Sequence, residues 1–397
     1  GNGDGKVTLG EVREHLDDQM TRAARRQFGR HQNVWVKGDS EAVLVNEIPK
    51  VRLASIVTAP SPQITMPAPP KSISIERGSS VRPFIHSTGL ATRWKMQSVF
   101  GSRLQLLGEL GVRMSDTIRS ASNDNIHIEF FEPGELSPSL RVLEAVSKGK
   151  IDAAWSTPGY HSGLDGGLLA FAGMPFTPKP RIFAAWLEQH GDKIANDLFY
   201  SRYGVHHLTC GVVGPEGAGW FKRPINNILD FRNLRMRFFG LGAKVVSKLG
   251  VSVQRIGAKD VYSALKQNTI GATEFSVPYI DKNLKFYQVA ENYYYPGWHK
   301  PATAIELIVN NRAWHGLSSS QRSLIQQVCD DNVRFGLDED ERLQNETLEE
   351  YRSLGVNLLQ LPWKVLEEIK RTWDAVAADE AKRSTLFAKA FLSLQKL

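Results

Sequence analysis

The sequence of 397 residues has few cysteines, no long apolar run and no dense basic block. Its two cysteines, Cys210 and Cys329, exclude a disulfide framework, and neither has partners at the spacing of a zinc site. We expect the two thiols to be buried apolar side chains rather than reactive groups. No run of 18 apolar residues occurs, so the sequence predicts no membrane-spanning helix.

The charge distribution excludes one class of partner. The formal net charge is +7, yet Lys and Arg are spread along the chain without a block of five or six, which argues against nucleic acid. A basic balance favours anionic partners instead. The chain begins at Gly1 without a methionine, so we expect any targeting peptide to lie upstream of this sequence.

Composition divides the chain into three parts. Residues 1–30 have the pattern of a calcium-loop remnant followed by a helix. Residues 31–88 contain Pro-rich stretches at 59–62 and 67–70, which predict an extended, largely irregular linker. The pattern of a globular domain occupies residues 89–397.

Strands and helices alternate in this third part. The expected strands are 94–99, 126–131, 151–155, 205–213, 234–239, 251–255 and 270–275. The expected helices are 107–118, 138–149, 240–249, 260–267 and most of 318–397. Such alternation predicts an α/β architecture with largely parallel sheets.

Residues 145–154 resemble residues 264–273, since each stretch is a helix end, a tight turn and a short strand. Ligands of open α/β sheets sit beyond the carboxyl ends of the strands, so two such units facing each other would enclose a cleft. The alternative is a chance match, because helix–turn–strand joints are common. The residues that would line one wall of the cleft are Trp155, Ser156, Thr157 and Tyr160, with Trp94 as a further candidate, and Glu274 and Phe275 would line the other. For Trp94, Thr157 and Tyr160 the alternative is ordinary packing.

Charged residues next to strand ends and glycines carry the candidate chemistry. Arg237 ends an expected strand, and its guanidinium fits a carboxylate bidentately. Glu216 lies in a Gly-rich segment, and Glu274 follows another expected strand. The alternatives are that Arg237 is a surface residue or pairs structurally with Glu274, and that Glu216 is a solvated loop residue.

Five unusual strings, in this order, resemble the solute receptors of tripartite ATP-independent periplasmic (TRAP) transporters, the DctP family. The resemblance is closest to the TakP-like branch, which binds α-keto acids and lactate. The strings are WKMQS at 94–98, GAGWF at 217–221, LRMR at 234–237, IGATE at 270–274 and YYYPGWH at 293–299. The resemblance covers roughly residues 90–397.

The resemblance implies a two-lobed, periplasmic-binding-protein (Venus flytrap) fold with a helical C-terminal region. It gives Arg237 the role of gripping the ligand carboxylate and Glu274 that of coordinating a cation. The carbonyl of Phe275, where the family usually has Trp, would add a cation ligand. Glu216, where the family commonly has Gln, would add a negative charge that favours Ca²⁺ over Na⁺.

The implied function is an extracytoplasmic, periplasmic solute-binding protein. It would capture a small 2-oxo or 2-hydroxy monocarboxylate, such as pyruvate or lactate, with a metal ion for transmembrane transport. The implied partners are the TRAP membrane subunits, and some members form homodimers. We expect no enzyme activity, because Cys210 and the nearby His206 and His207 need not meet on a strand.

The first residues match the later part of an EF-hand calcium loop. Asn2 and Asp4 would supply side-chain oxygens, Lys6 a carbonyl and Glu11 a bidentate carboxylate. The alternative is a turn that caps the following helix. This motif leaves two further functions open, a calcium-regulated sensor or interaction protein that reuses a receptor domain, and an enzyme on a receptor-like scaffold.

Overall fold

The computed structural model describes residues 6–8, 43–46 and 91–397, and the chain divides into two compact units, residues 1–81 and 82–397. In the first unit, strand β1 (Lys6–Thr8) pairs antiparallel with β2 (Val43–Asn46). Strand β2 is a short exception to the irregular linker that we predicted. The predicted calcium ligands Asn2, Asp4 and Glu11 lie outside the described residues, so the calcium loop stays a prediction.

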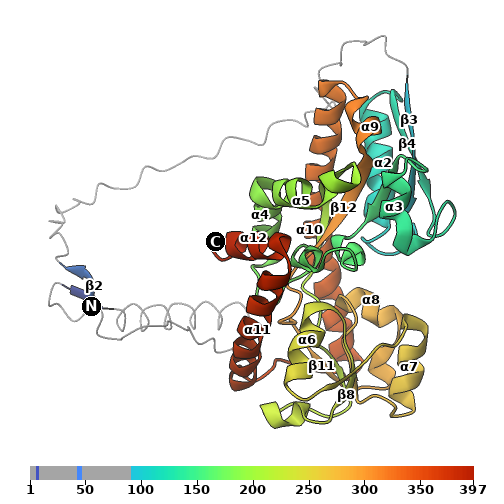
Figure 1. Ribbon diagram of the computed structural model, residues 1–397. Helices are drawn as coiled ribbons and strands as arrows, with labels where there is room; N and C mark the ends of the chain where they lie inside the picture. The colour runs from blue at the N-terminus through green and yellow to red at the C-terminus, as the bar shows by residue number, and fades with distance from the viewer. Residues whose placement is uncertain (1–5, 9–42, 47–90) are drawn as a thin grey trace, which may run out of the picture. The chain divides into compact units, whose positions relative to one another are not determined.

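The second unit contains a five-stranded sheet, which with its helices we call lobe 1 (Figure 1). Its strand order is β4-β3-β5-β12-β6. The strands are β3 (Thr92–Ser98), β4 (Ile126–Phe131), β5 (Ala153–Ser156), β6 (Val205–Val213) and β12 (Thr303–Asn310). The helices next to them in sequence are α2 (Glu109–Ala121), η1 (Ser139–Arg141), α3 (Val142–Ser147) and α9 (Asn311–His315).

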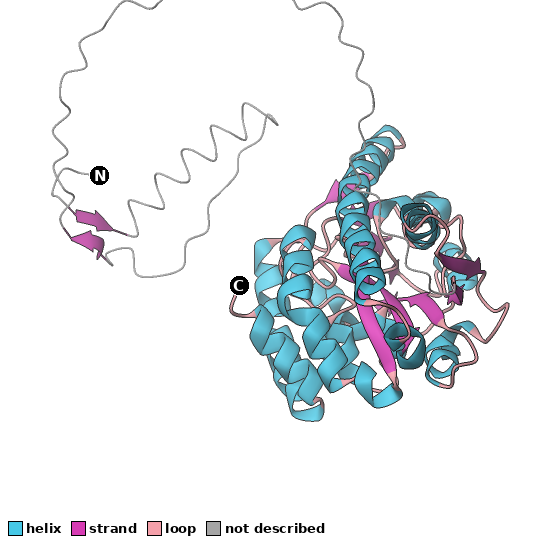
Figure 2. Cartoon of the chain, turned by 90° about the horizontal axis from the view of Figure 1, so that it is seen from above, coloured by secondary structure: helices cyan, strands magenta, loops and turns pink. Residues whose placement is uncertain are grey.

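A six-stranded sheet organises lobe 2, with the order β13-β11-β7-β10-β8-β9. Its strands are β7 (Gly219–Phe221), β8 (Arg235–Arg237), β9 (Ser252–Gln254), β10 (Ala272–Thr273), β11 (Asn292–Tyr294) and β13 (Asn357–Leu359). The helices are α6 (Gly240–Lys248), α7 (Ala258–Lys266) and α8 (Pro278–Asn283). Figure 2 shows helices on both sides of the strands.

Both sheets are mixed, so the expectation of largely parallel sheets is wrong. Strand β12 runs antiparallel to both β5 and β6, and β7 runs antiparallel to β10 and β11. The reason lies in the path of the chain. Strand β6 leads out of lobe 1 toward β7, and β12 returns from lobe 2, so these two neighbours must run in opposite directions.

Helices complete the fold. The long α10 (Ser319–Ser353) begins at a capping box formed by Ser318 and Gln321. It packs against β6 and α2 of lobe 1 and against α8 and β13 of lobe 2. It is followed by α11 (Trp363–Arg383) and α12 (Thr385–Leu394), as the helical C-terminal prediction requires. Among the described helices, none is both long enough and apolar enough to cross a membrane.

The shorter helical segments either connect lobe 1 with the helices α10, α11 and α12 or form turns within lobe 2. They are η2 (Pro158–His161), η3 (Gly166–Ala170), α4 (Pro180–Trp186), η4 (Leu187–Gly191), α5 (Asp192–Leu198), η5 (Tyr200–Tyr203), η6 (Ile228–Phe231) and η7 (Phe286–Gln288).

Cys210 and Cys329 form a disulfide that joins β6 to α10, with Cα atoms 4.2 Å apart. Both side chains are fully buried, as expected, but the prediction of two free thiols is wrong. The residues are 119 positions apart in sequence, so only the packing of α10 on β6 brings them together. A loop of that length corresponds to a stabilisation of about 4–5 kcal/mol in the chain-entropy account.

Trp94 belongs to the core of lobe 1 rather than to a ligand-binding wall. Its side chain is 4% exposed and clusters with Met96, Leu110 and Met114, between β3 and α2. The alternation along β3 places Trp94 and Met96 on one face of the strand. Trp94 therefore fits the packing alternative, and we exclude it from the site described below.

Candidate functional site

Strand pairing in lobe 2 brings Arg237 and Glu274 together. Thr273 at the end of β10 is the partner of Arg237 at the end of β8, and the Glu274 N–H donates to the Arg237 carbonyl at 3.0 Å. The Arg237 Nη1 donates to Glu274 Oε2 at 2.6 Å and also to the Glu274 carbonyl oxygen. The structural pairing of Arg237 with Glu274, given above as an alternative to a ligand-binding role, therefore exists at the end of the sheet where both strands stop.

Two loops add the other charged groups. The Glu216 N–H donates to the Lys300 carbonyl at 3.1 Å, and the Gly297 N–H donates to the Glu216 carbonyl at 2.7 Å. These bonds join the loop after β6 to the loop after β11. As a result Glu216, from a segment far away in sequence, lies beside Glu274.

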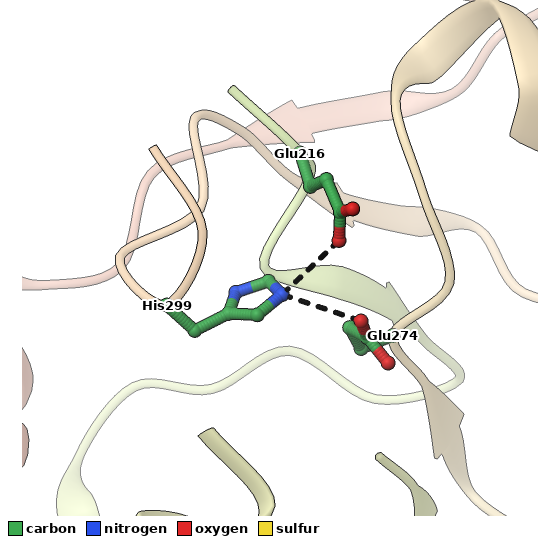
Figure 3. A group of neighbouring side chains, drawn as sticks. All are labelled: Glu216, Glu274 and His299. Carbon is green, nitrogen blue, oxygen red and sulfur yellow. Dashed lines mark ion pairs between the residues drawn. The ribbon is translucent and has the colours of Figure 1, made fainter. Parts of the chain in front are cut away.

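Figure 3 shows the carboxylates of Glu216 and Glu274 pointing toward the imidazole of His299. The His299 Nε2 lies 3.6 Å from Glu216 Oε2 and 3.4 Å from Glu274 Oε1. One ligand atom from each of the three residues falls within 4.8 Å of the others, which is close enough to hold a metal ion. All three residues are buried. This is the cluster that the sequence predicted in part, through its two glutamates.

Lys300 enters the same cluster. Its Nζ lies 3.3 Å from Glu216 Oε2 and 3.5 Å from Glu274 Oε1. Neither of these oxygens accepts a hydrogen bond from any described residue, so each keeps acceptor capacity in a buried place. Sequence reasoning gave no role to His299 or Lys300. Only their positions, His299 as the last residue of the aromatic string 293–299 and Lys300 directly after it, could have signalled one.

The pKa shifts of Glu274, Lys300 and His299 each favour the charged form. Burial alone would raise the pKa of Glu274, but Lys300, His299 and Arg237 hold it at about 2. Burial opposes the charged form of Lys300, yet Glu216 and Glu274 raise its pKa to about 12. The same two carboxylates raise the pKa of His299 against the effect of its burial. The site is therefore a compact set of paired charges rather than a set of isolated ones.

Aromatic rings hold the guanidinium of Arg237. Its Cζ lies 4.3 Å from the ring centroid of Phe239 and 4.7 Å from that of Phe275. Phe275 was predicted at the site, whereas Phe239 was missed because an apolar residue at the end of the expected strand 234–239 carries no distinctive pattern. The Arg237 Nε is buried and makes no hydrogen bond to any described residue.

Thr157 and Tyr160 follow β5 in lobe 1, as the cleft prediction requires. The Thr157 hydroxyl donates to the Ala304 carbonyl at 2.9 Å and is thus already engaged. Tyr160 is 47% exposed, and its ring lies 5.8 Å from that of Phe100. Partial burial raises the pKa of Tyr160, and the charges that act on it belong to Lys300, Glu216 and Arg237. Tyr160 therefore lies near the charged cluster of lobe 2.

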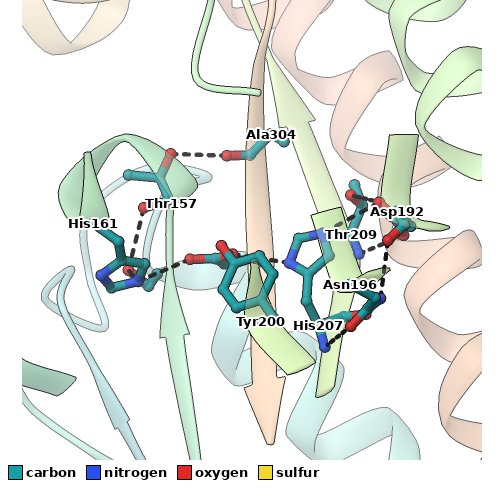
Figure 4. Close-up of polar contacts among 10 residues, drawn as sticks. Thr157, His161, Asp192, Asn196, Tyr200, His207, Thr209 and Ala304 are labelled. Atoms are coloured by element: carbon teal, nitrogen blue, oxygen red, sulfur yellow. Dashed lines mark hydrogen bonds and ion pairs between the residues drawn. The ribbon is translucent and has the colours of Figure 1, made fainter. Parts of the chain in front are cut away.

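A second polar network lies behind this wall, and the sequence did not reveal it (Figure 4). Glu306, fully buried on β12, contacts His161 Nε2 at 3.1 Å and His207 Nδ1 at 2.9 Å, and accepts a bond from the Tyr200 hydroxyl. The other His207 nitrogen faces Asp192 at 3.3 Å. The network ties η2, which carries Tyr160, to β12 and to the edge strand β6.

Residues 99–383 match the family of bacterial extracellular solute-binding proteins, family 7 (DctP), and the chain belongs to this family. One curated relative is the monocarboxylate 2-oxoacid-binding periplasmic protein of Nostoc sp. (strain PCC 7120). It is 28% identical over 300 residues, which are 75% of this chain and 82% of the relative. The chain is therefore a transport solute-binding protein rather than an enzyme, as we expected.

Solved structures support the same assignment. A TRAP transporter solute-binding protein from Bordetella bronchiseptica, with calcium and picolinate at its active site, is 26% identical with a TM-score of 0.70, over 78% of this chain and 92% of that one. Periplasmic TRAP proteins from Colwellia psychrerythraea, with calcium and pyruvate, and Pseudoalteromonas atlantica, with sodium and pyruvate, are each 25% identical, with TM-scores of 0.71 and 0.70. Each covers 77% of this chain and 93% of its own. The predicted two-lobed fold is confirmed.

Proposed function

We propose that this chain is the extracytoplasmic receptor of a TRAP transport system and that it captures a small 2-oxo or 2-hydroxy monocarboxylate, such as pyruvate or lactate. The observation that carries the proposal is Arg237. The residue is 8% exposed, and its guanidinium is fixed by Glu274 and two aromatic rings and retains a buried Nε without a hydrogen-bond partner among the described residues. A ligand carboxylate would complete the hydrogen bonding of this group.

The residues around Arg237 suit a small acid. Phe239 and Phe275 cover the guanidinium with apolar rings, and Tyr160 of lobe 1 presents a half-exposed ring near the same charges. Apolar walls around a single charged anchor favour a short, singly charged ligand. Thr157 supports the wall from behind through its bond to Ala304, rather than by offering a free hydroxyl.

The carboxylates that the family resemblance gives to a cation are present, but an ammonium group shares them. Glu216 and Glu274 contribute buried carboxylate oxygens that accept no hydrogen bond, and these two groups and the Phe275 carbonyl are the ligands that we propose for a calcium or sodium ion wherever one binds. Two carboxylates favour a divalent ion. The ammonium of Lys300 lies within 3.5 Å of both carboxylates, however, so it already supplies positive charge at the place where an ion would sit.

Calorimetry tests the proposal directly. Pyruvate and lactate should bind the wild-type chain and raise its melting temperature, because the ligand binds only the folded state. Arg237→Ala should abolish both effects. Arg235→Ala is the matched control, since Arg235 lies on the same strand but is exposed and should leave binding unchanged. Binding of pyruvate by Arg237→Ala with the wild-type affinity would refute the assignment.

Compartment and partners follow from the same proposal. We infer a periplasmic location and delivery of the acid to the TRAP membrane subunits, with a homodimer as a further arrangement to test by light scattering. The alternative function, a calcium-regulated sensor, rests on Asn2, Asp4 and Glu11, which lie outside the described residues.

A further inference from the structure

The ammonium of Lys300 lies between the two carboxylates that we propose as cation ligands. Its Nζ is 3.3 Å from Glu216 Oε2 and 3.5 Å from Glu274 Oε1. These are the two carboxylate oxygens that accept no hydrogen bond from the described residues. An ammonium group has donors only and cannot coordinate a metal ion, so it competes with an ion for these oxygens.

The stem of Lys300 is held in place by the fold. Gly173, with φ at +101°, lies against it, and a Cβ at position 173 would come within 2.6 Å of the Lys300 Cγ. The Lys300 carbonyl also accepts the Glu216 N–H at 3.1 Å, which fixes the backbone beside the acidic pair. The side chain is 22% exposed, so the ammonium end can leave while the stem remains packed.

Lys300 changes the balance of positive and negative charges at the site. Arg237 and Lys300 carry two positive charges, and Glu216 and Glu274 carry two negative ones, so these four groups sum to zero. A protonated His299 beside the same carboxylates would add one positive charge. Without Lys300 the site has one positive charge fewer to offset an incoming monocarboxylate, and a metal ion at the same oxygens would restore it.

We propose that Lys300 is a tethered cation that takes the place of the metal ion, so that this receptor captures its acid without calcium or sodium and binds free calcium weakly. The proposal rests on the proposed function for the identity of the ligand. The competition between Lys300 and calcium does not depend on the proposed function, because it involves only the protein and the metal.

The first experiment uses calcium alone. Calorimetric titration of calcium into the wild-type chain should give weak binding, and Lys300→Gln should bind calcium at least about tenfold more tightly, because a positive charge beside the ion is removed. Lys300→Arg keeps the charge and should behave like the wild type. The control is Lys282→Gln, which removes a half-buried lysine of α8 that pairs with Glu350 of α10. Equal calcium affinity in wild type and Lys300→Gln would overturn the proposal.

The second experiment uses pyruvate in a sodium-free buffer with chelator, and again with calcium. The wild-type affinity should differ by less than about threefold between the buffers, whereas Lys300→Gln should lose at least about tenfold in chelator and recover it with calcium. A wild-type chain that loses its affinity in chelator as much as Lys300→Gln does would refute the proposal. Absence of acid binding in every buffer would instead refute the proposed function, and the calcium titration would still decide the role of Lys300. Melting curves of each variant establish that it is folded.

Discussion

Replacing Glu306 with glutamine removes the charge at the centre of the polar network in lobe 1. The carboxylate is fully buried and lies within 3.1 Å of His161 Nε2 and 2.9 Å of His207 Nδ1. Breaking a buried ion pair by removing one partner typically costs about 3–5 kcal/mol, since the remaining groups stay buried without a counter-charge. For a unit of this size the melting temperature should fall by roughly 5–8 °C.

The pH dependence gives the prediction a second signature. Burial disfavours the charged form of Glu306, but His161 and His207 hold its pKa at about 2, below its ordinary value of 4.5. Its contribution is therefore complete above pH 4.5 and is lost as the pH falls toward 2. Burial likewise opposes protonation of His207, yet Asp192 and Glu306 raise its pKa to about 9 from 6.5. That contribution is complete below pH 6.5 and is lost as the pH rises through 9.

Thermal melts followed by circular dichroism, from acid to alkaline pH, measure both effects. Glu306→Gln should lower the melting temperature most between pH 4.5 and 6.5, where both contributions are complete in the wild type. Glu339→Gln on α10 is the control, because its carboxylate is exposed in part and pairs with Arg342 at the surface. A fall for Glu306→Gln no larger than for this control, at every pH, would refute the reasoning.

Two further predictions concern the disulfide and the ring that faces solvent at the site. Cys210→Ser, or reduction of the wild type, should lower the free energy of unfolding by about 4–5 kcal/mol. Denaturant titration with and without reductant measures this change. A change below about 1 kcal/mol would contradict the chain-entropy account of the disulfide. Phe239→Ala should weaken pyruvate binding by about two- to fivefold, because the Arg237 guanidinium loses one of its two rings at a contact worth about 0.5–1 kcal/mol. Calorimetry measures the loss, and an unchanged affinity would show that the Phe275 ring suffices.

Local patterns predicted most elements because they depend on neighbours in the chain. Strands 126–131 and 205–213 have the expected bounds, and the helix predicted at 240–249 ends one residue earlier, at Lys248. The direction of β12 was not predictable from its own residues, because it depends on where the chain has been before it returns to lobe 1.

The residues of the site also divide into those that the sequence could indicate and those that depend on tertiary contacts. Arg237 and Glu274 could be proposed together because the family resemblance gives both of them a role in binding, and the structure pairs them. Trp94 was misassigned because an aromatic residue near a strand end has the same local pattern in a core as in a cleft. Lys300 was missed because a lysine after an aromatic string is usually solvated. Only the joining of two distant loops places it between carboxylates.

The path of the chain between the lobes restricts how they can approach each other. Two strands cross, one in each direction, and their ends touch, since a Cβ at Gly214 would lie 2.8 Å from the Pro301 carbonyl. The Gly214 N–H also donates to Asp340 on α10 at 3.2 Å, and four residues earlier Cys210 fastens β6 to the same helix. The two connections between the lobes thus meet in a small region around residues 214 and 301. Since α10 contacts both lobes, any movement of one lobe against the other would have to be accommodated along this helix as well.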